Sequence, residues 1–251
     1  TFSKKIDLML CLFPFEEKLL RENGVNAKYI GHPLADKIPL EINKHVAKKS
    51  LGIEEDTVVT LMPGSRRNEL KYHAGIIFDA AKKLSKELYS SGQRTVKFIV
   101  PTQFPELQDI LNKQDRDEFE KYIFLDDASK AIPASDLVIT KSGTSTLESA
   151  IFKKPTIVIY KMPTLSFYFL KVLNIVKTQY AALPNILLGR EIFPELIQNQ
   201  VTSENIKIKA LEILSHQEET DQIIKDLREL HDSLKKNSAL KSAQAIEDIV
   251  A

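Results

Sequence analysis

The sequence predicts an α/β protein built on a doubly wound parallel sheet, with a helical carboxyl-terminal tail. Three observations predict this fold class. Between residues 44 and 160, short apolar runs typical of buried strands alternate with amphipathic helical segments. Two of these strands lead directly into glycine-containing turns that open a helix, an arrangement that binds anions. From about residue 204 the chain is charged and carries apolar stripes at helical spacing.

The composition limits the classes of function to consider. The 251 residues are 43% hydrophobic and 27% charged, which is ordinary for a globular protein. A formal net charge of +1 gives no general argument for nucleic acid as a partner. The single cysteine, Cys11, excludes an internal disulfide framework and fits a reducing compartment. The apolar runs are shorter than a membrane span, and the first residue, Thr1, indicates the later part of a longer protein.

The chain opens with two predicted strands around a helix. Residues 6–12 predict a buried strand, residues 14–23 an amphipathic helix closed by Gly24, and residues 25–30 a second strand. The second strand ends at a Gly-His-Pro turn, at the edge where open α/β sheets collect ligands. His32 in this turn therefore either contacts a substrate or holds the turn by hydrogen bonds.

The first anion-binding turn follows the third predicted strand. Around this turn the sequence predicts a connector at 34–43, a helix at 44–51, a strand at 58–62 and a long helix at 69–88. Gly64, Ser65 and Arg66 lie in the turn between strand and helix, where a phosphate would meet N–H donors and guanidinium groups. Arginines at a helix start oppose the helix dipole, so their position favours contact with an anion.

The alternation then continues to residue 160. The remaining elements are strand 96–100, helix 105–119, strand 122–125, helix 128–134, strand 137–140, a helix opened by a second turn, and strand 156–160. Strands alternating with helices form a parallel sheet that is covered on both faces.

The second turn, residues 140–149, is rich in small polar side chains. Gly143 lets an anion approach the main chain, and Ser142 and Thr144 supply hydroxyls at the positive end of the following helix. Glu148, one turn further along, would accept hydrogen bonds from neutral hydroxyls such as those of a ribose. The alternative is an ordinary serine or threonine helix cap without a ligand.

Residues 149–190 contain no acidic side chain but six lysines and arginines. Within this stretch, Phe167, Phe169 and Lys171 combine apolar and basic groups, as contacts with a lipid headgroup, an acyl chain or a membrane surface require. A buried helix whose lysines reach out to solvent at its ends is an equal alternative.

A predicted loop at 182–191 closes the acid-free stretch. Proline and glycine bracket it, so we expect it to return to the ligand edge of the sheet. Asn185 and Arg190 are its polar candidates.

Five motifs occur along the chain in a fixed order: Phe13-Pro14-Phe15-Glu16; Gly31-His32-Pro33-Leu34 with Asp36; Met62-Pro63-Gly64-Ser65-Arg66 with Glu69; Ser142-Gly143-Thr144 with Leu147-Glu148; and Leu183-Pro184-Asn185-Ile186-Leu187 with Gly189-Arg190-Glu191. Their order and spacing resemble those of the lipid-A-disaccharide synthases over nearly the whole chain.

The resemblance implies an inverting glycosyltransferase of the type with two Rossmann-like domains. Such enzymes transfer 2,3-diacylglucosamine from its UDP donor to 2,3-diacylglucosamine 1-phosphate and release UDP. The implied partners are these two acylated sugars and the cytoplasmic face of the inner membrane, where the protein would be peripheral. Neither a metal nor a cofactor is expected, because preorganised donors stabilise the departing UDP. An uncovered apolar face would also favour a homo-oligomer.

The resemblance also implies roles for individual residues. Ser142, Gly143 and Thr144 would lie near the diphosphate, Glu148 on the ribose, and Arg66 beside the charge that grows as UDP departs. The full set of expected donor-binding residues is Gly64, Ser65, Arg66, Ser142, Gly143, Thr144, Glu148, Asn185 and Arg190.

The same resemblance suggests a division of the chain. Residues 1–36 would be a remnant of the amino-terminal Rossmann-like domain and a linker, 37–203 the Rossmann-like domain that binds the nucleotide-sugar donor, and 204–251 helices that pack back toward the amino-terminal domain. The glycine-rich opening motif and the acidic general base of the family do not occur in this sequence. The catalytic base is therefore unknown, and we expect the chain alone to be inactive.

Two other functions fit the same residues. A UDP-sugar epimerase uses a similar nucleotide site, and would act on UDP-N-acetylglucosamine without an acceptor. A non-catalytic protein that binds UDP or a membrane would show binding but no transfer.

Overall fold

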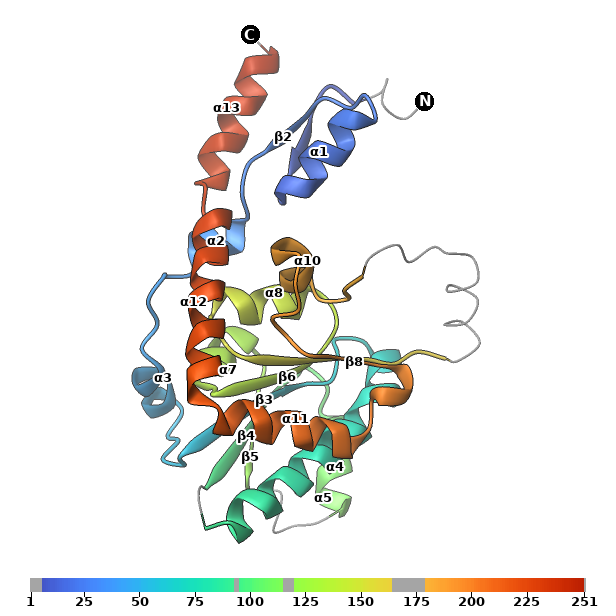
Figure 1. Cartoon of the computed structure of the whole chain (residues 1–251), viewed down its shortest axis with the longest axis vertical. Helices are drawn as coiled ribbons and strands as arrows, with labels where there is room; N and C mark the ends of the chain where they lie inside the picture. Colours follow the sequence, from blue (N-terminus) through green and yellow to red (C-terminus); the bar gives the residue numbers. More distant parts are fainter. Residues whose placement is uncertain (1–5, 93–94, 115–119, 164–178, 251) are drawn as a thin grey trace. The chain divides into compact units, whose positions relative to one another are not determined.

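The computed structural model describes residues 6–92, 95–114, 120–163 and 179–250 (Figure 1). The chain divides into two compact units, one formed by residues 1–41 with 226–251 and the other by residues 42–225. No helix among the described residues is long and apolar enough to cross a membrane.

The larger unit is built on a six-stranded sheet of strand order β5-β4-β3-β6-β7-β8. Every neighbouring pair of strands is parallel, which confirms the predicted fold class. The strands are β3 (Thr57–Met62), β4 (Val96–Pro101), β5 (Tyr122–Leu125), β6 (Leu137–Lys141), β7 (Thr156–Tyr160) and β8 (Glu195–Ile197). Because β3 lies between β4 and β6, the strand order reverses there, and ligands bind at such a point.

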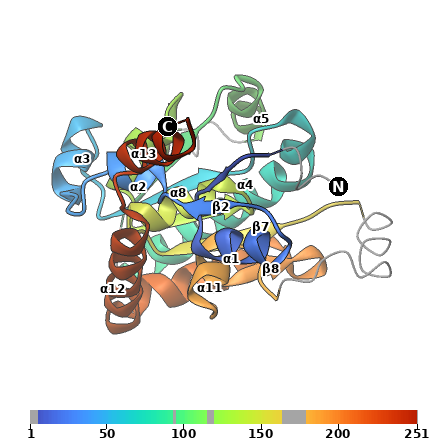
Figure 2. The same ribbon diagram turned by 90° about the horizontal axis from the view of Figure 1, so that it is seen from above.

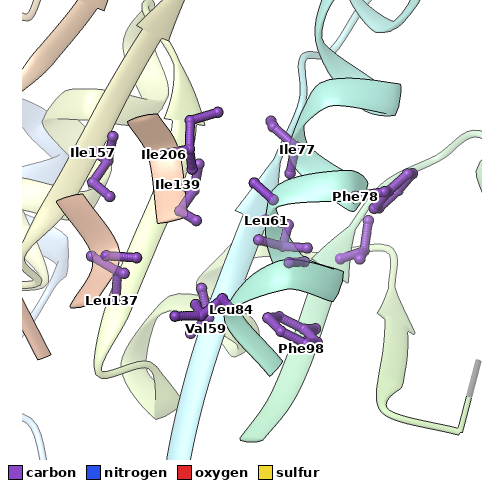
Figure 3. Packing of buried hydrophobic residues seen from close by; sticks show 14 of the residues in the cluster. Val59, Leu61, Ile77, Phe78, Leu84, Phe98, Leu137, Ile139, Ile157 and Ile206 are labelled. Carbon is purple, nitrogen blue, oxygen red and sulfur yellow. The ribbon is translucent and has the colours of Figure 1, made fainter. Parts of the chain in front are cut away.

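Helices cover both faces of this sheet (Figure 1). One face carries α4 (Arg67–Ser90), α5 (Glu106–Gln114) and α11 (Ser203–Ser215), and the other carries α3 (Lys44–Ser50), α7 (Ala128–Ala134) and α8 (Thr144–Ile151). The strands are apolar on both sides, as strands buried between two helical layers must be. On the α4 face, Leu61 and Phe98 of the sheet pack with Ile77 and Leu84 of α4 (Figure 3).

Two local predictions for the chain were wrong. The loop expected at 182–191 contains a helix, α10 (Leu183–Leu188), with Pro184 in its first turn and the left-handed Gly189 at its end. The connector expected at 34–43 begins with a short helix, α2 (Pro33–Lys37). The sequence also did not predict β8, which lies beside β7 at the edge of the sheet (Figure 2).

The smaller unit contains a two-stranded parallel sheet and the end of the chain. Strands β1 (Met9–Cys11) and β2 (Ala27–Tyr29) flank α1 (Pro14–Glu22). The predicted carboxyl-terminal helices are confirmed, and beyond α11 they are α12 (Gln217–Leu234) and α13 (Ser238–Val250). A short 3-10 helix, η2 (Gln198–Gln200), precedes α11 in the larger unit.

The Gly-His-Pro turn of the smaller unit packs against the end of α12. His32 Nδ1 accepts the N–H of Leu34 at 3.2 Å, and the His32 N–H donates to the Leu234 carbonyl at 2.9 Å. Gly31 has φ +90°, and a Cβ there would lie 2.5 Å from the Lys236 Cβ. Of the two interpretations of His32, the structure shows the one in which it holds the turn.

Candidate functional site

A pocket of about 500 Å³ lies at the carboxyl ends of β3, β4, β5 and β6, within the larger unit. Its position is the point of strand reversal at which open α/β sheets bind ligands. Seven of the residues expected to bind the donor line it: Gly64, Ser65, Arg66, Ser142, Gly143, Thr144 and Glu148. The two turns singled out in the sequence therefore form one cavity.

The β3–α4 turn is shaped by the carboxylate of Glu69. Glu69 Oε2 accepts the N–H of Ser65 at 3.0 Å, so the side chain folds back over the turn. Gly64 has φ +137°, and a Cβ there would lie 2.6 Å from the Glu69 Cβ and 2.8 Å from Oε2. The side chain of Arg66 is 81% exposed, and its contact with Glu69 Oε1 is 3.5 Å long. The guanidinium is thus accessible from the pocket.

The β6–α8 turn leaves its helix without a side-chain cap. Gly143 is the N-cap of α8, and none of the described side chains bonds the cap. The hydroxyls nearby are used elsewhere: Ser142 Oγ donates to the Ala181 carbonyl at 2.8 Å, and Thr146 Oγ1 donates to the Gly143 carbonyl at 2.8 Å. The alternative of a serine or threonine cap is therefore not what the structure contains. The start of α8 faces the pocket with N–H groups that an anion could accept.

Lys141 is a pocket residue that sequence reasoning missed. It ends β6, and its Nζ donates to Glu69 Oε1 at 3.0 Å. Both side chains are largely buried, with 19% of Lys141 and 16% of Glu69 exposed. Burial alone would raise the pKa of Glu69, but hydrogen bonds from Lys141 and Ser65, with the charge of Arg66, bring this pKa below its usual value. Glu69 is therefore an anion at neutral pH.

Glu148 also lines the pocket, but its pKa is raised, whereas that of Glu69 is lowered. Burial raises its pKa, and the nearby charge of Asp127 raises it further. Among the described residues, none donates a hydrogen bond or forms an ion pair with the Glu148 carboxylate. A half-buried carboxylate in such a place can accept hydrogen bonds from a ligand.

The opposite wall of the pocket comes from the loops after β4 and β5. Thr102, Gln103, Phe104 and Asp126 contribute to it, and none of them was predicted. The Phe104 N–H donates to Thr102 Oγ1 at 3.1 Å, which fixes the loop after β4. The turn-defining glycines that marked the other two loops are absent from residues 101–104 and 126–128 of the sequence.

Asn185 lies outside the pocket lining and is fully buried. Its Oδ1 accepts the N–H groups of Ile192 and Phe193 at 2.9 Å each, and its Nδ2 donates to Glu195 Oε1 at 2.8 Å. Glu195 in turn accepts the N–H of Ala181 at 2.8 Å, and the Ala181 carbonyl receives the Ser142 hydroxyl. Asn185 therefore supports the pocket edge indirectly.

The remaining residues predicted to bind substrate do not line the pocket or lie outside the described residues. Arg190 is exposed and does not line the pocket. Phe167, Phe169 and Lys171 lie outside the described residues. Within the described ranges, no three His, Cys, Asp or Glu side chains are grouped as ligands for one metal ion.

His73 joins the first turns of α4 to the end of β7. It is 1% exposed, its Nδ1 lies 2.7 Å from the Glu69 carbonyl, and its Nε2 accepts the N–H of Lys161 at 3.0 Å. A ring that accepts at Nε2 donates from Nδ1, so His73 is neutral. Burial lowers its pKa accordingly.

Nearly the whole chain resembles one protein family. Residues 1–250 match the family described as Lipid-A-disaccharide synthetase. The chain is 36% identical over 250 residues to the Lipid-A-disaccharide synthase of Paraburkholderia phymatum, covering 98% of this chain and 62% of that protein. It is also 36% identical over 244 residues to the enzyme of Pseudomonas putida, covering 96% and 62%. The chain thus spans about three fifths of the length of these curated relatives.

Solved structures share the fold at low sequence identity. A glycosyltransferase from Rickettsia africae has a TM-score of 0.55 at 14% identity, covering 96% of this chain and 63% of that one. The wall teichoic acid polymerase TagF has a TM-score of 0.55 at 17% identity, covering 99% and 58%. The MnaA protein of S. aureus, solved with UDP, has a TM-score of 0.56 at 15% identity, covering 88% and 56%. These likenesses concern the fold alone.

Proposed function

Because the chain belongs to the lipid-A-disaccharide synthetase family, we propose that it carries the nucleotide-sugar half of a glycosyltransferase of lipid A biosynthesis. The proposed reaction transfers 2,3-diacylglucosamine from its UDP donor to 2,3-diacylglucosamine 1-phosphate. The products are lipid A disaccharide 1-phosphate and UDP.

The observation that carries this proposal is the pocket at the point of strand reversal. Two helices, α4 and α8, begin at its rim, and both present the positive end of the helix dipole to it. A diphosphate bound there would meet the N–H groups of Gly143 and Thr144 and the exposed guanidinium of Arg66. Negative charge grows on UDP as the glycosidic bond breaks, so donors fixed in advance lower the barrier.

Glu148 is proposed to bind the ribose of the donor. Its carboxylate faces the pocket without a described partner, and two neighbouring ribose hydroxyls are suitable donors for it. Gly64, Ser65 and Ser142 shape the two turns. Asn185 is proposed to hold the Ser142 side of the pocket through Glu195, and Arg190 stays a proposed donor-side residue outside the pocket lining.

The proposal includes the division suggested by the sequence. Residues 1–36 would belong with an amino-terminal Rossmann-like domain, 37–203 with the donor domain, and 204–251 with helices that return toward the amino-terminal domain. The acidic base that activates the acceptor hydroxyl would come from that amino-terminal domain, so this chain alone is expected to bind UDP without transferring sugar.

The acylated substrates suggest where the protein acts. We place it peripherally on the cytoplasmic face of the inner membrane, with the acid-free stretch and its residues Phe167, Phe169 and Lys171 toward acyl chains or headgroups. Self-association through uncovered apolar surface also belongs to this proposal.

Titration with UDP by calorimetry tests the donor site. Arg66→Ala and Glu148→Ala are each expected to weaken binding about 10-fold or more, because each removes a charged contact. The controls are Arg21→Ala and Glu212→Ala, which remove charged side chains outside the pocket lining and should leave the affinity unchanged. Absence of binding at millimolar UDP, or equal binding of ADP, would contradict the proposal.

The two alternatives make different predictions in the same assay. Conversion of UDP-N-acetylglucosamine without an acceptor would indicate an epimerase. UDP or vesicle binding without transfer, even when the amino-terminal domain is supplied separately, would indicate a non-catalytic protein.

A further inference from the structure

Lys141 is placed where a lysine is electrostatically unfavourable unless an anion is present. A Cβ built on Gly143, the N-cap of α8, would lie 3.7 Å from Lys141 Nζ, so the ammonium rests against the start of that helix. The start of a helix carries partial positive charge, and a cation there is destabilising by about 0.3–1 kcal/mol.

The ammonium of Lys141 also has hydrogen-bonding capacity to spare. It carries three N–H donors, and among the described residues only Glu69 accepts one of them. Lys141 Nζ also lies over the ring of Tyr160, 5.9 Å from its centroid. Because Lys141 lines the pocket, the remaining donors are available to a ligand there.

Glu69 offsets part of the charge of Lys141, but its carboxylate also accepts hydrogen bonds from two other residues. The same carboxylate accepts hydrogen bonds from the Ser65 N–H and, at 3.5 Å, from Arg66. The ion pair therefore fixes the Lys141 ammonium between the two anion-binding turns. The single carboxylate of Glu69 accepts hydrogen bonds from three donors, on Ser65, Arg66 and Lys141. A group of this charge and placement suits an additional multiply charged anion.

We propose that Lys141 directly contacts the diphosphate of the nucleotide sugar, and that Glu69 is the positioning residue that holds Lys141 between the two turns. This inference rests on the proposed donor site and adds a contact to it. Arg66 is exposed and would contact the phosphates from the rim, whereas Lys141 is set into the pocket wall and is fixed before the ligand arrives.

The chain offers a matched control for a purely structural ion pair. Lys97 of β4 pairs with Glu55 at 3.1 Å, with 20% and 27% of the two side chains exposed. These values resemble those of the Lys141 and Glu69 pair, but neither Lys97 nor Glu55 lines the pocket. Lys97 Nζ also donates to the Glu120 carbonyl at 3.0 Å. Loss of Lys97 therefore measures the effect of losing a largely buried lysine and its contacts away from the pocket.

The test compares the affinities of uridine, UMP and UDP for the wild-type chain, Lys141→Met and Lys97→Met by competition calorimetry. Lys141→Met should weaken UDP binding about 10- to 100-fold, as loss of a charged hydrogen bond does, and leave uridine binding within about twofold. Lys97→Met should change neither. Lys141→Arg, which keeps the charge, should recover part of the UDP affinity. Lys141→Gln repeats the test with a polar side chain in case the methionine variant does not fold.

The role of Glu69 is tested by a double-mutant cycle on UDP affinity. Glu69→Gln should weaken UDP binding in the wild-type background, and should weaken it much less when Lys141 is already methionine. Equal effects in both backgrounds would show that Glu69 does not act through Lys141.

Three further outcomes would overturn the inference. If both Lys141→Met and Lys141→Gln bind UDP like the wild type, the donor site stands and Lys141 is not part of it. If uridine and UDP lose the same factor, Lys141 has only a general structural effect. If the wild-type chain binds no UDP, the proposed function fails and the inference fails with it.

Discussion

Glu69 shapes one side of the pocket through contacts that leave no room for a side chain at position 64. Its Oε2 accepts the Ser65 N–H at 3.0 Å and would lie 2.8 Å from a Cβ on Gly64. Gly64 also has φ +137°, a conformation that other residues rarely adopt. The turn therefore depends on both a glycine and a carboxylate five residues later.

Gly64→Ala is expected to destabilise the protein by about 1–3 kcal/mol and to weaken UDP binding, because the backbone of an alanine is strained in this conformation and Glu69 must move. The control is Gly75→Ala in α4, where a Cβ would meet nothing within 4 Å. Alanine there should stabilise the helix by about 0.5–1 kcal/mol. Urea unfolding of both variants measures these differences, and equal effects of the two substitutions would contradict the strain argument.

Glu148 is expected to lower the stability of the free protein while contributing to UDP binding. Its pKa is raised by burial, so its contribution to stability is fully present below the unfolded pKa and is lost as pH rises through the folded pKa. Ionisation of this half-buried carboxyl group therefore costs stability, and Glu148→Gln should raise the free energy of unfolding at pH 7 while weakening UDP binding. The stability gain should disappear near pH 4.

Urea unfolding at pH 7 and pH 4 measures this effect, with Glu212→Gln on exposed surface as the control. A Glu148→Gln variant that is less stable than the wild type at pH 7 would show that the carboxylate has a stabilising partner in the fold.

At the scale of elements, a carboxylate from a distant part of the chain accepts hydrogen bonds from the backbone at the start of α13. Asp36 of α2 accepts the N–H groups of Lys236, Asn237 and Ser238, at 3.1, 2.9 and 2.6 Å. The first N–H groups of a helix have no partner within it, so Asp36 caps α13 as a local side chain usually would.

Asp36→Ala should cost about 1–2 kcal/mol and fray the start of α13. Burial would raise the pKa of Asp36, but the hydrogen bonds from Ser238, Asn237 and Lys236 lower it overall. The contribution is therefore present above the unfolded pKa and is lost as pH falls through the folded pKa. Unfolding at pH 7 and in acid measures it, and Asp232→Ala on the exposed side of α12 is the control. A difference that persists unchanged in acid would rule out the charged cap.

The elements also show how far sequence patterns can predict this fold. Runs such as Val58-Val59-Thr60-Leu61 are apolar on both sides, and only a strand between two layers needs that pattern. Strand β8 has three residues, begins at Glu195 and follows a proline, so no pattern marked it. Helix α10 was missed because Pro184 and Gly189 suggested a loop, although both residues are common at helix ends.

At the scale of the whole molecule, a single cavity combines turns that are far apart in the sequence. Both turns were predicted as anion sites, because a strand, a glycine and a helix start are local signals. The pair of Glu69 and Lys141 joins residues 72 positions apart, and no local pattern indicates such a contact. The buried environment of Asn185 likewise depends on β8, which was not predicted.

Hydrogen exchange with and without UDP tests this description of the cavity. At a UDP concentration 100-fold above Kd, binding adds about 2.7 kcal/mol to the opening of the site. Amides of both turns, such as those of Ser65 and Thr144, should therefore exchange more slowly. Amides at the amino ends of the strands, such as that of Thr57 in β3, should change least. Protection confined to one turn would contradict a single shared site.

The contact between Asp36 and the start of α13 joins residues 202 positions apart, which has a consequence for protein synthesis. Strands β1 and β2 are translated before the larger unit, but the helix that Asp36 caps follows only after that unit has been translated. At about 5–20 residues per second this delay is on the order of 10–40 s. The larger unit can complete its sheet during that time, since its strands all lie between these two segments. Asp36 therefore gains its three N–H partners only after the larger unit has been synthesised.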